Sequence, residues 1–577
     1  MKSKVLACAI WLLASMAWAG PKVDIKFDRF HGYTGTVEYL KAVQKAYPGI
    51  TELLEIGKSV HGRPMYVLAI TNKKTGTTVD REKKLQFERK LEVPNPPVTA
   101  LDQGKAAYMI TGCTHGNELT GNEVCLYFID KMVSGYDTDP EIKQLIDNRV
   151  FYVCPAINVD GLYNTVELGA TQRVNSMNGF GTQRKDLNGD GKWSQVRYKD
   201  PKGYYRIDPE DPRLMTAIRS VDEVPESERY SVIWETESDK GIDLNRNFPE
   251  AWWNMQTRMP AGSGEYATSA PETQAICEFI ITHTNILMVN EYHTQGGYTY
   301  RPLGSGADKG MNPRDVVVYD QILGKKYQEL MGVKDLHTAW RAAYSNTASY
   351  AGLLLDWLYK QCGIYSMATE LWNPAYEIAE LKDLKGAELQ KGILKYVADK
   401  GLYLPWKPAK HPVHGNVEVG GWLSAPGPNN AYPGEPLLKI CERQYQFDRY
   451  CISLLPQMDI QNVSAKVTAS AGGTKVVEIT ADIVNTGALP SGLQNTENMA
   501  FCRGDVAWLV GANNKMKVIS GEACTRLGNL YGTKQIPGFR GSNKQTVKWV
   551  VAVEGNEALK IVASSLKGGT VVKPVKY

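Results

Sequence analysis

Short apolar runs that alternate with helical patterns constrain the fold of this chain more than any other feature of its sequence. The apolar runs lie at residues 106–111, 150–157, 286–293 and 364–370. Runs of this kind are typical of parallel strands that are buried on both faces. The helical patterns lie at residues 36–46, 121–133 and 270–283. This alternation predicts an α/β domain with a mixed, mostly parallel central sheet that is flanked by helices.

The composition and hydrophobic pattern of the sequence change after about residue 405. Residues 406–457 begin with a stretch rich in Pro and Gly, which we interpret as a connector. From residue 458 to 577 the chain alternates in short β-rich runs separated by turn residues, a pattern that predicts a small all-β sandwich. We therefore expect an α/β domain at 20–405 and a β domain at 458–577.

The first 19 residues have the pattern of a cleavable signal peptide. Two lysines precede an apolar run, and Ala17-Trp18-Ala19 offers a small-x-small cleavage site. A membrane anchor is the alternative, but the run is shorter than the roughly 20 residues of a spanning helix, and no second apolar segment follows. The sequence predicts a secreted or periplasmic protein without a membrane span.

Composition narrows the class of partner. The 577 residues carry a formal net charge of +4 without a long basic run, so nucleic acid is not an expected partner. The thiols of an exported chain can be oxidised to disulfides. Two local pairs, Cys441 with Cys451 and Cys502 with Cys524, are candidate disulfides.

Two metal-binding side chains follow the first apolar run. In TGCTHGNELTGNE, His115 and Glu118 are three residues apart, so both can face one point from a helical turn. An imidazole nitrogen and a carboxylate oxygen are both ligands of zinc, and a catalytic zinc takes three protein ligands and keeps one position open. His293, at the end of another apolar run, supplies a third ligand. A surface histidine and glutamate on a turn are the alternative.

Two further stretches contain candidate functional groups. Asn245 and Arg246 adjoin each other in GIDLNRNF, where a guanidinium beside an amide suits a carboxylate. An ordinary loop is the alternative. Glu370 ends a buried strand, and partial burial would raise its pKa and suit it to act as a general base.

Five motifs in order give the chain a family resemblance. They are LLEIGKSVHGRPMYVLAI, GCTHGNELTGNE, PAINVDG, GIDLNRNF and DWLYKQCGIYSMATE. Together they span roughly residues 28 to 400, and the chain resembles the zinc carboxypeptidases of the carboxypeptidase A type. The resemblance implies that His115, Glu118 and His293 bind one catalytic Zn²⁺ and that Glu370 is the general base and acid.

The same resemblance assigns the substrate contacts. Asn245 and Arg246 match the pair that holds the terminal carboxylate of the substrate. Arg184, in TQRKD, matches the arginine that stabilises the oxyanion, although about 60 residues separate it from Asn245, more than is usual in the family. Tyr350 matches the tyrosine that closes over the substrate, and Tyr344 is its rival. Either tyrosine is alternatively a core residue.

The position before Asp356 helps to line the pocket for the terminal side chain in the family, and here it is Leu355. A leucine favours an apolar or aromatic terminal residue. We therefore expect a secreted zinc carboxypeptidase that acts on the C-termini of peptides or proteins. The alternatives are a zinc peptidase of cell-wall stem peptides and a catalytically inactive peptide-binding protein.

Two expectations concern the regions around the catalytic motifs. Residues 20–30 leave no room for the inhibitory segment of the family's animal digestive members, so we expect activity without processing. In DLNGDGKW, the residues Asp186, Asn188 and Asp190 resemble the start of a calcium loop, although the twelfth position holds Arg197 rather than glutamate. A solvated turn is the alternative to a Ca²⁺ site.

Overall fold

A computed structural model describes most of the chain. The described residues are 23–75, 104–169, 171–177, 186–220, 224–234, 241–254, 262–304, 308–342, 350–499, 502, 504–513 and 515–577. The expected signal peptide, Arg184 and Tyr344 lie outside them.

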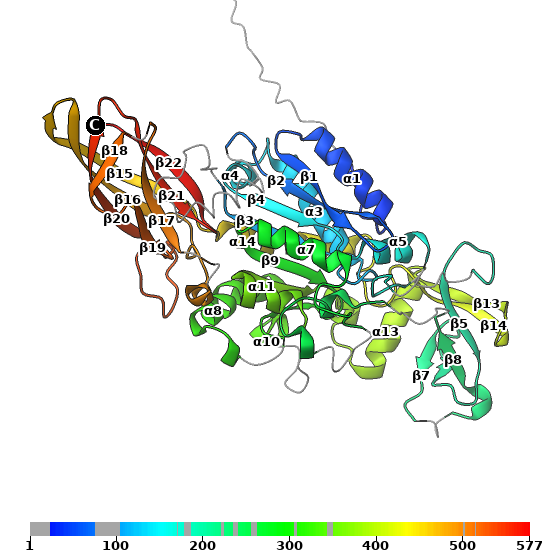
Figure 1. Ribbon diagram of the computed structural model, residues 1–577. Helices are drawn as coiled ribbons and strands as arrows, with labels where there is room; N and C mark the ends of the chain where they lie inside the picture. The colour runs from blue at the N-terminus through cyan, green and yellow to red at the C-terminus, as the bar shows by residue number, and fades with distance from the viewer. Residues whose placement is uncertain are drawn as a thin grey trace, which may run out of the picture.

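An eight-stranded sheet forms the centre of the first domain (Figure 1). Its strands are β1 (Thr51–Lys58), β2 (Pro64–Ile70), β3 (Ala107–Thr111), β4 (Val150–Cys154), β9 (Ile286–His293), β10 (Tyr298–Arg301), β11 (Trp340–Ala342) and β12 (Tyr365–Glu370). Their spatial order is β1-β2-β4-β3-β9-β12-β10-β11. Four of the seven neighbouring pairs are parallel, including the central run β4-β3-β9-β12. The predicted mixed, mostly parallel sheet is confirmed.

Helices cover both faces of this sheet (Figure 1). They include α1 (Tyr33–Ala46), α3 (Thr120–Gly135), α4 (Pro140–Asn148), α5 (Val159–Glu167), α7 (Pro271–Thr282), α8 (Pro313–Val317), α9 (Lys325–Met331), α10 (Leu336–Ala339), α11 (Leu354–Cys362), α12 (Pro374–Glu377), α13 (Gly386–Asp399) and α14 (Glu435–Ser453). Two neighbours on β4 show the layering. Phe128 of α3 packs on Phe151, whereas Phe279 of α7 packs on Tyr152, and successive strand residues point to opposite faces.

A second, smaller sheet projects from this body (Figure 1). It contains β5 (Ser194–Lys199), β6 (Tyr205–Ile207), β7 (Met215–Ala217), β8 (Tyr230–Ile233), β13 (Tyr403–His411) and β14 (Gly415–Leu423). Strand β14 pairs with β5 across more than 200 residues of sequence, with Glu418 opposite Arg197. The insertion before GIDLNRNF and the chain after residue 400 therefore build one unit.

The segment 406–457 differs from the connector that its Pro and Gly content predicts. Its first part forms most of the hairpin β13–β14, and its last part is the 19-residue helix α14, which packs on α3 and β3. This helix also excludes the disulfide proposed for Cys441 and Cys451. The two cysteines are ten residues apart on α14, about 15 Å along its axis, whereas a disulfide needs Cα atoms within about 7 Å. Nor does a disulfide join Cys502 to Cys524 among the described residues.

The C-terminal domain consists of two four-stranded antiparallel sheets. One contains β15 (Met458–Ala471), β16 (Thr474–Asn485), β20 (Lys544–Glu554) and β18 (Met516–Ser520), and the other contains β19 (Cys524–Gly528), β17 (Asp505–Gly511), β21 (Leu559–Ser565) and β22 (Gly569–Val575). Ile479 and Trp549 of the first sheet share one apolar core with Leu509 and Ile561 of the second. This face-to-face packing is the predicted sandwich.

The β domain docks on the central sheet at the end opposite to the metal-binding motifs. Lys567 donates to the carbonyl of Ile286 at 2.7 Å, and Ile286 begins β9, whereas His293 ends it. Asp315 of α8 accepts hydrogen bonds from the backbone N–H groups of Gln494 and Asn495. In the part of the chain that the structure describes, no helix is long and apolar enough to span a bilayer.

Candidate active site

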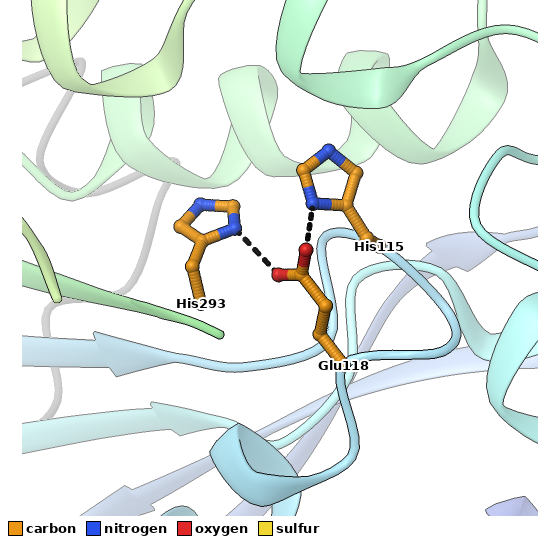
Figure 2. A group of neighbouring side chains, drawn as sticks. All are labelled: His115, Glu118 and His293. Carbon is orange, nitrogen blue, oxygen red and sulfur yellow. Dashed lines mark hydrogen bonds and ion pairs between the residues drawn. The ribbon is translucent and has the colours of Figure 1, made fainter. Parts of the chain in front are cut away.

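Three side chains with metal-binding atoms meet at the carboxyl ends of β3 and β9. His115 and Glu118 lie in the loop that follows β3, and His293 is the last residue of β9. All three are buried. Figure 2 shows Glu118 between the two imidazoles, with its Oε1 2.9 Å from His115 Nδ1 and its Oε2 2.9 Å from His293 Nδ1. The three ligand atoms lie within 4.8 Å of one another. Parallel strands thus bring side chains far apart in sequence to one edge, as expected for an open α/β sheet.

Glycines let this loop lie close to its neighbours. A Cβ atom on Gly116 would lie 2.3 Å from the Cα atom of Gly161, at the start of α5. A Cβ atom on Gly112 would lie 2.6 Å from the carbonyl oxygen of Pro155. Both distances are too short for a side chain. The glycines of GCTHGNE and PAINVDG therefore allow two close backbone contacts between these segments, and the contacts set the position of His115 and Glu118.

A second set of charges surrounds the ligands. His115 Nε2 lies 3.1 Å from Asp243 Oδ1, and His293 Nε2 lies 3.1 Å from Glu291 Oε1. Burial would raise the pKa of Glu118, but the two histidines together hold it well below its ordinary value. Burial likewise opposes protonation of His293, yet Glu291 and Glu118 raise its pKa well above the usual range. The field of the site is thus negative and suits a cation.

Arg173 is a residue of this site that the sequence reasoning missed. Its Nη1 donates to Glu118 Oε1 at 2.8 Å, and its side chain is 42% exposed. Its carbonyl accepts from the backbone N–H of Gly116 at 3.0 Å and from Asn158 Nδ2 at 3.1 Å. Two of the recognised motifs therefore hold Arg173 in place.

Arg184, chosen from the sequence for the same role, lies outside the described residues and stays a prediction. The signal that favours Arg173 is its place in the chain. It follows PAINVDG closely and precedes the insertion, whereas Arg184 stands where the insertion begins.

Glu370 ends β12, the strand beside β9. It pairs in register with His293 on one side and with Tyr298 of β10 on the other. Its side chain is half-buried. Burial raises the pKa of Glu370 to about 7, since the lowering by His293 is smaller than the cost of desolvation. A carboxyl group with such a pKa can both accept and donate a proton near neutral pH.

Asn245 and Arg246 lie in the short 3-10 helix η4 (Leu244–Arg246). Asp243 caps this helix by accepting from the backbone N–H of Asn245 at 3.0 Å. Asn245 Oδ1 accepts from the backbone N–H of Leu354, which leaves its amide nitrogen directed at His293, 3.2 Å from Nε2. The buried Arg246 Nε has no hydrogen-bond partner among the described residues. The pair therefore retains donors for an added anion.

Two residues chosen from the sequence lie at the edge of this group. The ring of Tyr350 lies 5.0 Å from Arg246 Cζ. Leu355, in the first turn of α11, is buried in a small apolar cluster with Tyr300, Leu353 and Ala368. Tyr350 packs against the same cluster. Ala368 is two residues before Glu370 and shares its face of the sheet, so this apolar wall lies beside the site.

The expected calcium loop receives no support. Asp186 Oδ1 accepts from the N–H of Gly189, and its Oδ2 accepts from the N–H of Gly191, both at 2.7 Å. Asn188 donates to Asp190 Oδ2 at 3.1 Å. The carboxylate oxygens that would bind Ca²⁺ instead close a turn. Among the described residues, the histidine–glutamate group above is the one cluster of His, Cys, Asp and Glu side chains close enough for a metal.

The donor atoms of that group fit zinc. Two imidazole nitrogens and one carboxylate oxygen are the ligands of a catalytic zinc with an open position. Each imidazole also has a carboxylate at its second nitrogen, as metal-binding histidines generally do.

Comparisons with known proteins agree with this donor set. A family model described as zinc carboxypeptidase matches residues 36–382, and a model of a domain of unknown function matches residues 457–576. The chain is 28% identical to carboxypeptidase M of Mus musculus over 276 residues, 47% of this chain and 41% of that protein. It is 19% identical to carboxypeptidase A6 of Mus musculus over 352 residues, 60% of this chain and 61% of that protein.

Among solved structures, carboxypeptidase A from Helicoverpa armigera is similar at 19% identity and a TM-score of 0.40, covering 62% of this chain and 69% of that chain. The chain thus spans less than two thirds of the length of the curated relatives named here. The family model, in contrast, covers more than half of this chain, from the first helix to the segment after Glu370. The chain belongs to the zinc carboxypeptidase family.

Proposed function

We propose that this protein is a secreted zinc carboxypeptidase that hydrolyses the C-terminal peptide bond of peptides or proteins. The supporting observation is the convergence of His115, Glu118 and His293 with Glu370 at the carboxyl ends of neighbouring strands. Bound there, zinc would polarise a carbonyl group and make water more acidic. Secretion rests on the signal-peptide pattern of residues 1–19.

The chain supplies the proton transfers and the charge stabilisation. Glu370 takes a proton from the attacking water and passes it to the amine that leaves. Arg173 donates through Nη1 to Glu118, so its guanidinium lies beside the metal-binding side chains. There it can stabilise the negative charge that develops on the carbonyl oxygen. Arg184 remains the candidate from the sequence for that task.

Binding of the chain end makes the enzyme an exopeptidase in this proposal. Arg246 and Asn245 donate to the terminal carboxylate of the substrate, and Tyr350 lies beside Arg246. Leu355 gives the pocket for the terminal side chain an apolar wall. We therefore expect faster release of Phe or Leu than of Lys.

A peptide panel tests this function. Residues 20–577 are incubated with peptides that differ only in their last residue, with and without a zinc chelator, and the products are weighed by mass spectrometry. Stepwise, chelator-sensitive loss of C-terminal residues is expected. Faster release of Lys than of Phe would contradict the role of Leu355. Zinc-loaded protein that shortens no peptide would favour a peptide-binding role.

One observation favours a second candidate, a zinc peptidase of cell-wall stem peptides. In the sheet, Tyr300 lies opposite Arg341 of β11 on one side and opposite Ala368 on the other. Tyr298 lies opposite Glu370. Because side chains alternate along a strand, all of these residues share one face of the sheet. The Arg341 guanidinium lies 3.5 Å from the centre of the Tyr298 ring. Burial and the Tyr298 hydroxyl raise the pKa of Tyr300. The charge of Glu370 raises it further, and the charge of Arg341 lowers it.

Arg341 is therefore a cation near the general base, and it offers a side-chain carboxylate the partner that Leu355 does not. The same panel decides between the candidates when it includes peptides that end in Glu and in a diamino-dicarboxylic acid. The cell-wall function predicts faster release of these two residues than of Phe, and a loss of that preference in Arg341→Gln. Equal preferences in Arg341→Gln and wild type would remove the second candidate.

A further inference from the structure

Glu291 is a buried carboxylate whose role the proposed reaction does not define. It lies on β9 two residues before His293, so both side chains point to the same face of the sheet. Only 1% of its surface is exposed. Its Oε1 accepts from the Thr114 hydroxyl at 2.7 Å and lies 3.1 Å from His293 Nε2. Its Oε2 is buried and has no hydrogen-bond partner among the described residues.

The contact repeats an arrangement found at the other histidine. His115 presents Nδ1 to Glu118 and Nε2 to Asp243, at 2.9 and 3.1 Å. His293 presents Nδ1 to Glu118 and Nε2 to Glu291, at the same two distances. Each imidazole thus lies between the shared ligand Glu118 and a second carboxylate of its own.

Proton positions decide what the second carboxylate does. An imidazole that binds a metal through Nδ1 carries its proton on Nε2, where it needs an acceptor. Among the described residues, two groups lie within reach of His293 Nε2, namely Asn245 Nδ2 at 3.2 Å and Glu291 Oε1 at 3.1 Å. An amide nitrogen is a donor and cannot accept this proton. Of these two, only Glu291 can hold His293 in the metal-binding tautomer.

We propose that Glu291 is a positioning residue for zinc, which fixes the tautomer and the ring orientation of His293. Thr114 in turn holds Glu291, and because Thr114 immediately precedes His115, it links the two segments that carry the histidines. The second oxygen of Glu291 has no hydrogen-bond partner among the described residues, and it would add negative charge to the surroundings of a bound cation. This inference rests on the proposed zinc site but does not depend on the peptidase reaction.

Zinc affinity of the full-length protein tests the proposal. The dissociation constants of wild type, Glu291→Gln and Glu291→Ala are measured by competition with a chromogenic chelator. Glu291→Ala is expected to bind zinc about 10- to 100-fold more weakly. Glu291→Gln keeps an acceptor oxygen but loses the charge, so its affinity should lie in between. The matched control is Asp448→Asn, which removes another buried carboxylate beside β9. Its hydrogen bonds within the described part of the chain go to Tyr108, Tyr292 and Asn290 and to no histidine.

Two readouts separate positioning from a merely structural role. Circular dichroism of the metal-free proteins should show that Glu291→Gln and wild type share one fold, so that a change in zinc affinity does not reflect unfolding. The visible absorption of the cobalt-substituted proteins should shift in Glu291→Gln, because the orientation of His293 changes, and should not shift in Asp448→Asn. Wild-type affinity and an unchanged cobalt spectrum in Glu291→Ala would overturn the proposal. Absence of peptidase activity in wild type would count against the proposed function alone, because zinc binding is measured without substrate.

Discussion

The two faces of strand β9 carry two different buried carboxylate groups. On one face, His293 and Glu291 take part in the metal-binding group. On the other face, Tyr292 and Asn290 donate to Asp448 of α14, as does Tyr108 of β3. Both groups are almost completely removed from water. Successive residues of one strand therefore contact two different groups, a set of metal-binding side chains on one face and the carboxyl group of Asp448 on the other.

The partners of the carboxylates make the difference. An imidazole can exchange a proton for a metal, so Glu118 between two histidines belongs to a site that can hold a cation. Asp448 accepts hydrogen bonds from two phenol groups and one amide group, and no cationic side chain pairs with it among the residues that the structure describes. Burial therefore raises the pKa of Asp448 to about 7. Burial alone does not create a metal site. The chemistry of the surrounding donors does.

The largest effect is expected for His293→Ala. Loss of one of three ligands should remove zinc, and with it several kcal/mol of transition-state stabilisation, so kcat/KM should fall by at least about 10⁴-fold. Metal analysis and peptide hydrolysis measure both quantities. Asp448→Asn, a change on α14 against the opposite face of the same strand, should keep its zinc. Equal zinc content in both variants would break the comparison between the faces.

Glu370→Gln should separate proton transfer from metal binding. The amide keeps the shape of the side chain but cannot accept a proton, so kcat should fall by about 10³-fold. Glu370 is not one of the three grouped ligands, so zinc content should stay at the wild-type level. A Glu370→Gln protein with full zinc and more than a tenth of the wild-type kcat would exclude the general-base role.

Arg173→Ala and Arg184→Ala form a matched pair. The guanidinium that holds the developing charge should be worth about 10²-fold in kcat. We expect this loss in Arg173→Ala, because Arg173 contacts Glu118, and a change within about twofold in Arg184→Ala. Steady-state kinetics on one good substrate decide the matter. A large loss in Arg184→Ala alone would return the role to the residue chosen from the sequence.

Local patterns allowed much of this fold to be predicted. The continuous apolar runs identified strands β3, β4, β9 and β12, because a strand buried on both faces has no polar alternation. Their ends then brought His115, His293 and Glu370 to one edge of the sheet. Contacts between segments far apart in sequence could not be predicted from these local patterns.

Three misses show what the local patterns did not predict. Strand β14 finds its partner β5 more than 200 residues away, and no local signal in the Pro- and Gly-rich stretch indicates that pairing. Arg173 is set by two hydrogen bonds to its carbonyl, from Gly116 and Asn158, so its own side-chain type carries little of the information. At Asp186, the pattern indicated a metal ligand, but backbone N–H groups take up its oxygens.

The smallest effect is expected for Asp448 and concerns stability rather than activity. Its pKa is about 7 in the folded protein and near 3.8 in the unfolded chain. Between about pH 4 and 7 the folded protein therefore keeps a proton that the unfolded chain has released, so wild-type stability should decline as the pH rises through this window. Three pKa units set an upper limit of about 4 kcal/mol on this loss.

Asp448→Asn removes the titration, so its unfolding midpoint should gain on that of wild type by several degrees between pH 5 and 8. Thermal unfolding of both full-length proteins across that range measures the difference. A constant difference between the two midpoints would show that Asp448 is ionised in the folded protein throughout. The carboxylates on the two faces of β9 would then differ in their hydrogen-bonding partners but not in their charge.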